Sequence, residues 1–171
     1  MSKYFFALLA IAIVPFTGCG NDDDSDGSTQ NQFTFNGTSY NIANGFLEEF
    51  GSNGNGSFDW DVYLVSSGIS VSGADLTGTG DLVYLDLNTD SSEGLVEGTY
   101  NFSNDRDNLT IVDGTVGVDF DLSGGGGTFA AVTGGTVTVD IDGNQTTISF
   151  NLTTNSGGNL TGNWRGTLQR F

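Results

Sequence analysis

Residues 135–168, "GTVTVDIDGNQTTISFNLTTNSGGNLTGNWRGTL", carry apolar side chains at alternate positions between two short polar turns. Alternation with a period of two is typical of a β-strand that buries one face. The turn segments "DGNQ" and "NSGGN" are rich in Asn, Asp and Gly, the residues that tight turns favour. This stretch therefore predicts three antiparallel strands joined in a meander.

The same alternation extends backward to residue 33, and sustained helical spacing is absent from the sequence. Further strands are predicted in residues 33–42, 58–65, 82–87, 98–102 and 116–122. About ten short strands joined by tight turns indicate an all-β domain. The segment "NGFLEEFG", residues 44–51, is expected to hold one helical turn at most.

Two arrangements of these strands remain open. An antiparallel meander closing into a small, calycin-like barrel is favoured by the final strand, where Gly162 and Gly166 share a face with Trp164. Glycine weakens a strand unless a large group approaches it closely, and an indole lying over two glycines would fill a barrel interior. The alternative is a two-sheet β-sandwich with a bulge at this position.

Composition excludes several classes of function. The chain has 21 acidic and 4 basic residues, no histidine and a formal net charge of −17. Nucleic-acid binding is excluded, because it depends on Lys and Arg displacing counterions from phosphates. Acid–base catalysis near neutral pH relies on histidine. We therefore predict a protein that is not an enzyme, with no catalytic residue. A carboxylate hydrolase is the weaker alternative, and it would use two of Glu48, Glu49, Glu93 and Glu97.

The N-terminal segment predicts export. Residues 4–14, "YFFALLAIAIV", form an apolar run of 11 residues, which is shorter than the 20 or so needed to span a bilayer. Its length is that of a signal-peptide core. The following "FTGC" resembles the lipobox of bacterial lipoproteins, which implies cleavage after Gly18 and acylation of Cys19, the only cysteine. Attachment to a membrane would then be by acyl chains.

Three regions follow from this reading: residues 1–18 as a lipoprotein signal peptide, residues 19–32 as a lipidated cysteine with a disordered acidic tether, and residues 33–171 as one β domain. The tether lacks apolar residues with which to fold. Its acidic cluster resembles the export signal of Bacteroidota surface lipoproteins, in which Asp22, Asp23, Asp24 and Asp26 would be read by the transport machinery. The resemblance implies an outer-membrane protein anchored by lipid and facing the cell exterior, and it implies no particular activity.

The ligand of the β domain is left open by the sequence. Trp60 and Trp164 are in phase with the apolar faces of their strands, so they are expected in the core or lining a cavity. The possible ligands are a glycan, a small apolar molecule or an envelope protein, bound by a monomer. Calcium is a possible cofactor at "NDRDN", residues 104–108, or "DIDGN", residues 140–144, although neither completes a calcium loop. A structural or accessory envelope protein without a small ligand is the alternative function.

Overall fold

The computed structural model describes residues 31–171, and every regular element in this range is a β-strand. The strands are β1 (Gln32–Phe35), β2 (Thr38–Asn41), β3 (Asn44–Ser52), β4 (Phe58–Val65), β5 (Ile69–Ser72), β6 (Asp75–Thr89), β7 (Gly98–Phe102), β8 (Thr110–Asp121), β9 (Thr128–Asp142), β10 (Gln145–Thr154), β11 (Asn159–Gly166) and β12 (Gln169–Arg170). The predicted signal peptide, the acylation of Cys19 and the export signal at Asp22, Asp23, Asp24 and Asp26 lie outside the described residues.

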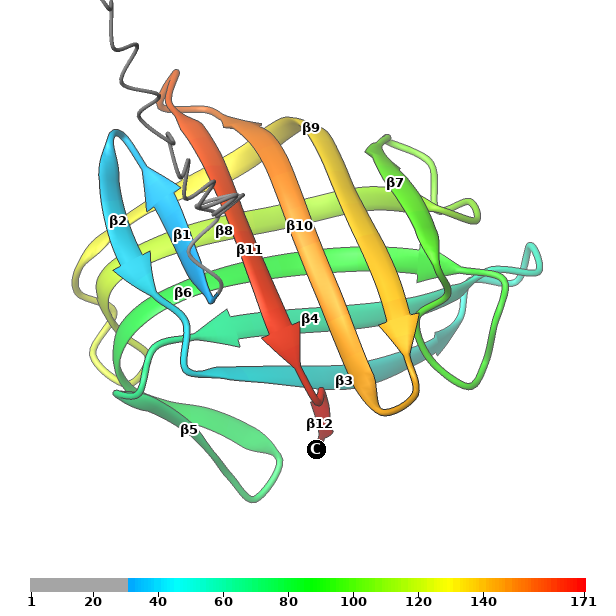
Figure 1. Cartoon of the computed structure of the whole chain (residues 1–171), viewed down its shortest axis with the longest axis horizontal. Coiled ribbons are helices and arrows are strands. Elements are labelled where there is room, and N and C mark those ends of the chain that lie inside the picture. The colour runs from blue at the N-terminus through cyan, green and yellow to red at the C-terminus, as the bar shows by residue number, and fades with distance from the viewer. Residues whose placement is uncertain (1–30) are drawn as a thin grey trace, which may run out of the picture.

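One strongly curled sheet makes up the domain, so the all-β, barrel-like prediction is confirmed. The strand order is β12-β3-β4-β6-β8-β7-β9-β10-β11-β1-β2, and β5 pairs with β6 outside this path. Figure 1 shows the resulting half barrel, in which β9, β10 and β11 cross steeply over a layer of β3, β4, β6 and β8. Two short pairings, β7 with β8 and β12 with β3, are parallel.

The meander predicted from residues 135–168 is confirmed as β9, β10 and β11. Ile148 of β10 lies opposite Val139 of β9 and Trp164 of β11. These three side chains are almost fully buried, which places them in one row on the core face. The alternation seen in the sequence thus specifies both the strands and their register, since a slip of one residue would turn this row toward solvent.

Residues 44–51, where one helical turn at most was expected, contain no helix and belong to β3. It pairs with β4 from Asn44 opposite Val65 to Ser52 opposite Phe58. The register shifts between Glu49 and Gly51, and the extra residue, Phe50, is 59% exposed. The bulge interrupts the period of two that identifies a strand in the sequence.

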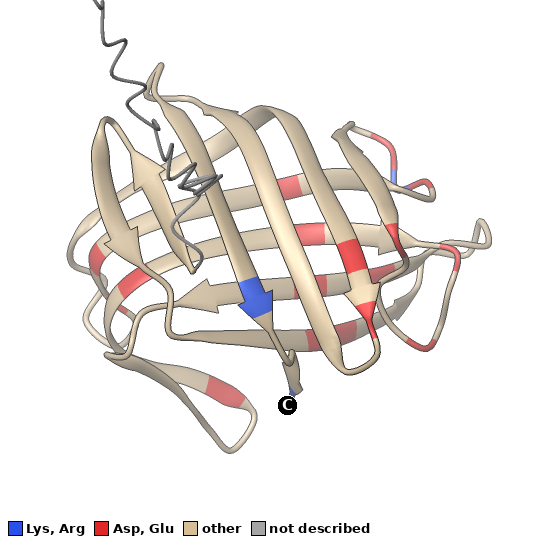
Figure 2. Cartoon of the chain, viewed as in Figure 1, with Lys and Arg blue, Asp and Glu red and all other residues tan. Residues whose placement is uncertain are grey.

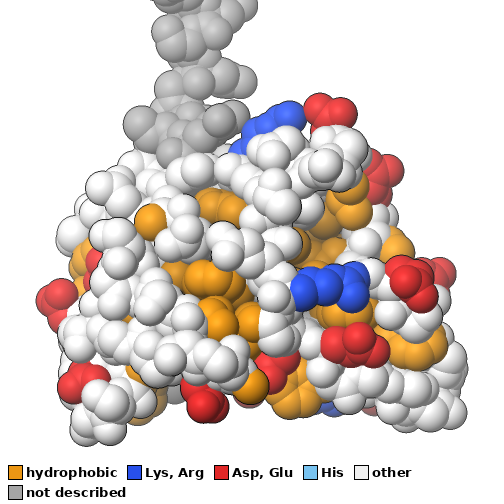
Figure 3. All heavy atoms as spheres, turned by 90° about the horizontal axis from the view of Figure 1, so that it is seen from below, with side chains coloured by type: hydrophobic (Ala, Val, Ile, Leu, Met, Phe, Trp, Pro, Cys, Tyr) orange, Lys and Arg blue, Asp and Glu red, His pale blue; other side chains and the backbone are white. Residues whose placement is uncertain are grey.

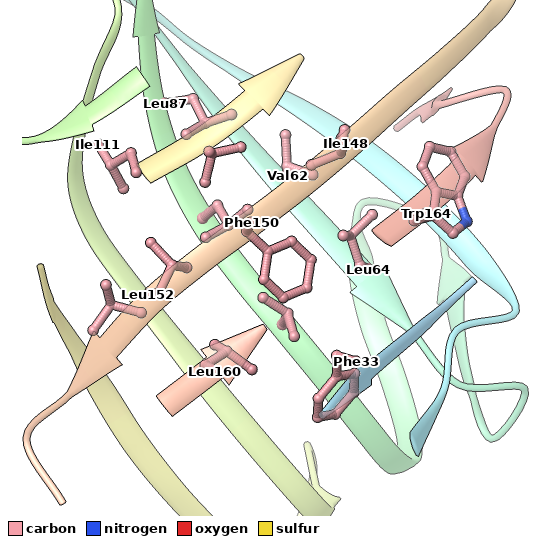
Figure 4. Packing of buried hydrophobic residues seen from close by; sticks show 14 of the residues in the cluster. Phe33, Val62, Leu64, Leu87, Ile111, Ile148, Phe150, Leu152, Leu160 and Trp164 are labelled. Carbon is pink, nitrogen blue, oxygen red and sulfur yellow. The ribbon is translucent and has the colours of Figure 1, made fainter. Parts of the chain in front are cut away.

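The core lies between the two crossing layers (Figure 4). Val62 and Leu64 point into it from β4, while Ile148 and Phe150 point into it from β10. All four side chains are at most 5% exposed. Burying a side chain of this size contributes about 1.5–3 kcal/mol, so the contact between layers is the main source of stability.

The indole of Trp164 packs against two glycines, Gly166 of its own strand and Gly45 of the other layer. The contact with Gly166 was predicted, and the contact predicted with Gly162 is not formed. A Cβ atom added at Gly166 would lie 2.5 Å from the indole, and one added at Gly45 of β3 would lie 2.6 Å from it. Gly162 instead faces the ring of Phe150. The indole therefore fills space between β11 and β3, and Gly45 takes the place that the sequence assigned to Gly162.

Candidate functional site

A row of four carboxylates crosses the outer face of the layer formed by β3, β4, β6 and β8. Glu48 pairs with Asp61, Asp61 with Asp86, and Asp86 with Asp113. Figure 2 shows these acidic positions side by side on the four strands. Directly opposed like charges destabilise a sheet, so the row requires groups that offset its charge.

Arg106 is the main such group. Asp59 lies two residues before Asp61 on the same face of β4, and the carboxylates of Asp59, Asp61 and Asp86 have oxygens within 4.8 Å of one another. The Arg106 guanidinium donates to Asp59 at 2.5 Å and to both oxygens of Asp86 at 2.7 and 3.1 Å. A forked, charge-assisted contact of this kind is among the strongest hydrogen bonds in proteins.

Hydrogen bonds hold the loop between β7 and β8 in a position from which the Arg106 side chain reaches the row of carboxylates. The backbone carbonyl of Arg106 accepts hydrogen bonds from Ser57 Oγ at 2.6 Å and from Asn55 Nδ2 at 2.8 Å. Asn53 binds both Ser57 and the fully buried Asn88. The turn between β3 and β4 therefore holds the arginine loop against β6.

Two tyrosines hold the third carboxylate. Tyr63 and Tyr84 each donate a hydrogen bond of 3.1 Å to one oxygen of Asp61, and their rings stack with centroids 5.3 Å apart. Tyr63 is also within 3.1 Å of Glu48. Asp61 is only 6% exposed, so these hydroxyls replace most of its water contacts.

The row shifts the titration of its members. Burial, followed by the charge of Asp86, raises the pKa of Asp61 to about 7, against the opposing tyrosine hydrogen bonds. Burial, followed by the hydrogen bond with Asp59, raises the pKa of Asp86 to about 6, against the opposing Arg106. Burial disfavours the charge of Arg106, but Asp86 more than offsets it and the pKa of Arg106 lies above its usual value.

Asp59, Asp61 and Asp86 offer the oxygen ligands that calcium prefers. Arg106 already lies against two of them, so a metal ion would have to displace its guanidinium. The predicted calcium segments do not form such a group within the described range. Residues 104–108 supply Arg106 instead, and in residues 140–144 Asp142 pairs with Arg165 at 3.1 Å.

The alternation of apolar side chains along residues 58–65 places Asp59 and Asp61 on the face of the strand opposite the core, but it does not reveal the row. The three aspartates of this group come from two strands that are not adjacent in sequence, and only the pairing of β4 with β6 places them together. In a sequence, acidic residues at alternate positions of a strand form the same pattern whether they lie on a solvated face or in a charge cluster. The tyrosines at positions 63 and 84, which are half-buried in the structure, were the available signal.

A separate groove opens between the two layers, on the face viewed in Figure 3, where apolar side chains lie between charged ones. Its volume is about 580 Å³. Leu47, Leu95, Ile141 and Leu168 supply apolar walls, and Asn144 and Arg170 are among its polar groups. This volume lies within the usual range for small-molecule sites, which are mostly apolar with a few polar groups.

Arg170 is an exposed residue that lines this groove and also contacts a buried tryptophan of the core. Its guanidinium stacks over the ring of Trp60 at 4.9 Å and donates a hydrogen bond to the carbonyl of Glu93. The Trp60 Nε1 in turn donates to the carbonyl of Ser91 at 3.1 Å. The loop between β6 and β7 and the short strand β12 thus form one wall of the groove together.

The tryptophans predicted as core or cavity residues are both buried. Trp60 is 1% exposed and Trp164 is 2% exposed. Neither is among the residues lining the groove, although Trp60 lies directly beneath Arg170. Their burial agrees with packing in the core, and it leaves their side chains as supports of the groove rather than its surface.

The four glutamates considered for a carboxylate hydrolase lie in different parts of the structure and make different contacts. Glu48 belongs to the acidic row, and Glu49 is exposed on the next position of β3. Glu93 lines the groove, and Glu97 accepts a hydrogen bond from the backbone N–H of Ile141 at 3.1 Å. The close carboxylates are aspartates instead, and they lie on the outer face of the sheet.

A smaller pocket of about 140 Å³ lies on that outer face, beside Phe120 and the 67% exposed Phe129. Thr115 supplies the only side-chain hydroxyl of its lining. With few polar groups to orient a ligand, this pocket is a weaker candidate than the groove.

Comparison of the chain with protein-family models, with curated proteins and with solved structures finds no match. Among residues 31–171, a helix of the length and apolarity needed to cross a bilayer is not found.

Proposed function

We propose that this chain is a lipid-anchored protein of the outer membrane, facing the cell exterior, whose non-enzymatic β domain binds a small ligand in the groove between its two layers. The observation that carries the proposal is the groove itself, with apolar walls from Leu47, Leu95, Ile141 and Leu168 around one basic side chain. The lining also has polar side chains that can orient a ligand, namely Glu93, Asn144, Thr146, Thr167 and Arg170.

Anchoring rests on the sequence. The apolar run of residues 4–14 ends just before Thr17, Gly18 and Cys19, and an acidic segment follows. Metabolic labelling with a lipid probe tests this part of the proposal. We expect the wild-type chain to be labelled and the Cys19→Ala variant to be unlabelled. Equal labelling of both chains would contradict acylation at Cys19.

A non-enzymatic role agrees with the engagement of the acidic row. Arg106 binds Asp59 and Asp86, and Tyr63 and Tyr84 bind Asp61. A carboxylate hydrolase needs one free acid and one free base on either side of a bound substrate. The alternative of a hydrolase is therefore the weaker one.

The binding proposal is tested by thermal unfolding of the full chain with a panel of soluble glycans and small amphipathic molecules. A ligand that binds the folded state raises the melting temperature, and the rise grows with the ligand concentration. The Ile141→Trp variant fills the groove from a position that is 37% exposed, and should therefore lose the shift. Thr99→Trp, on an exposed position of β7, serves as the control and should keep it.

An accessory envelope protein without a small ligand is the alternative. It predicts that no member of the panel shifts the melting temperature, and that Ile141→Trp behaves as the wild type in every arm.

A further inference from the structure

We infer that the groove recognises an amphipathic carboxylate, with Arg170 as the group that binds the anionic head. This inference rests on the proposed ligand-binding function and names the chemical class of the ligand. It concerns Arg170 because, among residues 31–171, the other polar side chains lining the groove are Glu93 and neutral groups.

Arg170 differs from the other arginines in the described part of the chain. Arg106 and Arg165 each form an ion pair with aspartates, whereas Arg170 forms none. One of its Nη atoms donates to the Glu93 carbonyl, which leaves the remaining N–H groups of the guanidinium available. In a chain with 21 acidic residues, an arginine without a carboxylate partner is a notable exception.

The guanidinium is also held in position. The guanidinium lies over the ring of Trp60 at 4.9 Å, and Gln169 and Arg170 of β12 pair with Phe46 and Leu47 of β3. A planar, oriented guanidinium suits the two oxygens of a carboxylate, which it binds through parallel hydrogen bonds. Because the side chain is ordered before the ligand arrives, less conformational freedom is lost on binding.

The acidic residues around the groove are partly engaged. Glu97 accepts from the Ile141 N–H, and Asp142 pairs with Arg165. Glu93 lines the groove, where Ser92 donates to its carboxylate. The more distant carboxylates are screened over about 8 Å at physiological salt. Arg170 is the one positively charged side chain among the described residues that line the groove, so it is the group there that can bind an anionic head.

The walls determine the rest of the ligand. Leu47, Leu95, Ile141 and Leu168 are apolar, so the part of the ligand beyond its carboxylate should be a hydrocarbon chain or an aromatic ring. Transfer of that part out of water contributes about 25 cal/mol for each Å² of apolar surface buried. A fully polar ligand would leave these walls without a partner.

The test uses the full chain and three probes that share a phenyl ring on a four-carbon chain: 4-phenylbutyrate, 4-phenylbutyramide, which has the same shape without the charge, and the cationic 4-phenylbutylamine. Their binding is measured by isothermal titration calorimetry. A charge-assisted contact predicts that the carboxylate binds at least tenfold more tightly than the neutral amide. In Arg170→Gln this preference should disappear, and Arg170→Lys should retain part of it. Arg165→Gln removes the same charge outside the groove and should change the preference by less than twofold.

Three results would overturn the inference. If the amide or the amine binds as tightly as the carboxylate, Arg170 does not select a carboxylate and the inference is refuted. If the Ile141→Trp variant then loses the binding of that probe, the groove still binds a ligand and the proposed function stands. Persistence of the carboxylate preference in Arg170→Gln, or its equal loss in Arg165→Gln, would remove Arg170 as its cause. Failure of all three probes to bind would also refute the inference, while the glycan arms of the thermal panel would still decide the proposed function.

Discussion

Replacing Asp61 with Asn should stabilise the protein at pH 8 and leave its stability nearly unchanged at pH 4. Burial and the charge of Asp86 raise the pKa of Asp61 from 3.8 to about 7 in the folded chain. Between these values the folded state binds a proton that the unfolded state releases. The free energy of unfolding therefore falls as pH rises from about 4 to 7.

The asparagine reproduces the protonated carboxyl without its titration. Tyr84 can donate to the amide oxygen, as it does to Asp61 now. The amide N–H₂ can donate to the Tyr63 oxygen, whose own proton then turns fully to Glu48. Each buried polar group keeps a partner, so removal of the charge is the main change.

The expected gain in the free energy of unfolding follows from the rise in the pKa of Asp61. A rise of about three pKa units corresponds to about 4 kcal/mol, at about 1.4 kcal/mol per unit, which is an upper limit. Relaxation and solvent at the rim of the row reduce it, and we expect a gain of about 2 kcal/mol at pH 8.

Urea denaturation followed by the fluorescence of Trp60 and Trp164 measures this gain. Histidine is absent from the chain, so few groups other than Asp61 and Asp86 titrate between about pH 5.5 and 8. Asp113→Asn, at the exposed end of the same row, is the matched control and should change stability by less than about 0.5 kcal/mol. If Asp61→Asn does not raise the free energy of unfolding at pH 8, or raises it as much at pH 4 as at pH 8, the raised pKa of Asp61 is contradicted.

Three further outcomes are expected. Arg106→Gln leaves buried carboxylates without their cation, so it should lower the free energy of unfolding by about 3 kcal/mol at pH 8 and by less at pH 5, as measured by urea denaturation. In that variant millimolar calcium chloride should restore part of the melting temperature, because three carboxylates within 4.8 Å become available, whereas the wild type should not respond. Gly166→Ala places a Cβ atom 2.5 Å from the Trp164 indole and should cost about 1–3 kcal/mol, while Gly126→Ala, whose Cβ meets nothing within 4 Å, should stay within about 0.5 kcal/mol of the wild type.

Strands in which buried and exposed side chains alternate could be predicted from the sequence. Strands whose conformation depends on pairing with a neighbouring strand were harder to predict. Residues 135–168 specify β9, β10 and β11, because a period of two assigns each side chain to one face whatever its neighbours are. β3 was not recognised, because its bulge at Phe50 breaks that period and its strand conformation depends on pairing with β4. Gly162 and Gly166 look equivalent in the sequence, yet Phe150 faces one and Trp164 the other.

Composition by itself argued against nucleic-acid binding and left no histidine for catalysis, and the apolar run before Cys19 predicted export. These predictions depend on which residues are present and not on where they fold. Only the tertiary structure brought together Asp59, Asp61, Asp86 and Arg106, and only the curling of the sheet placed Arg170 at a groove. The reason is that a site is a set of distances between strands. Those distances depend on register and crossing of layers, which the alternation along any single strand does not contain.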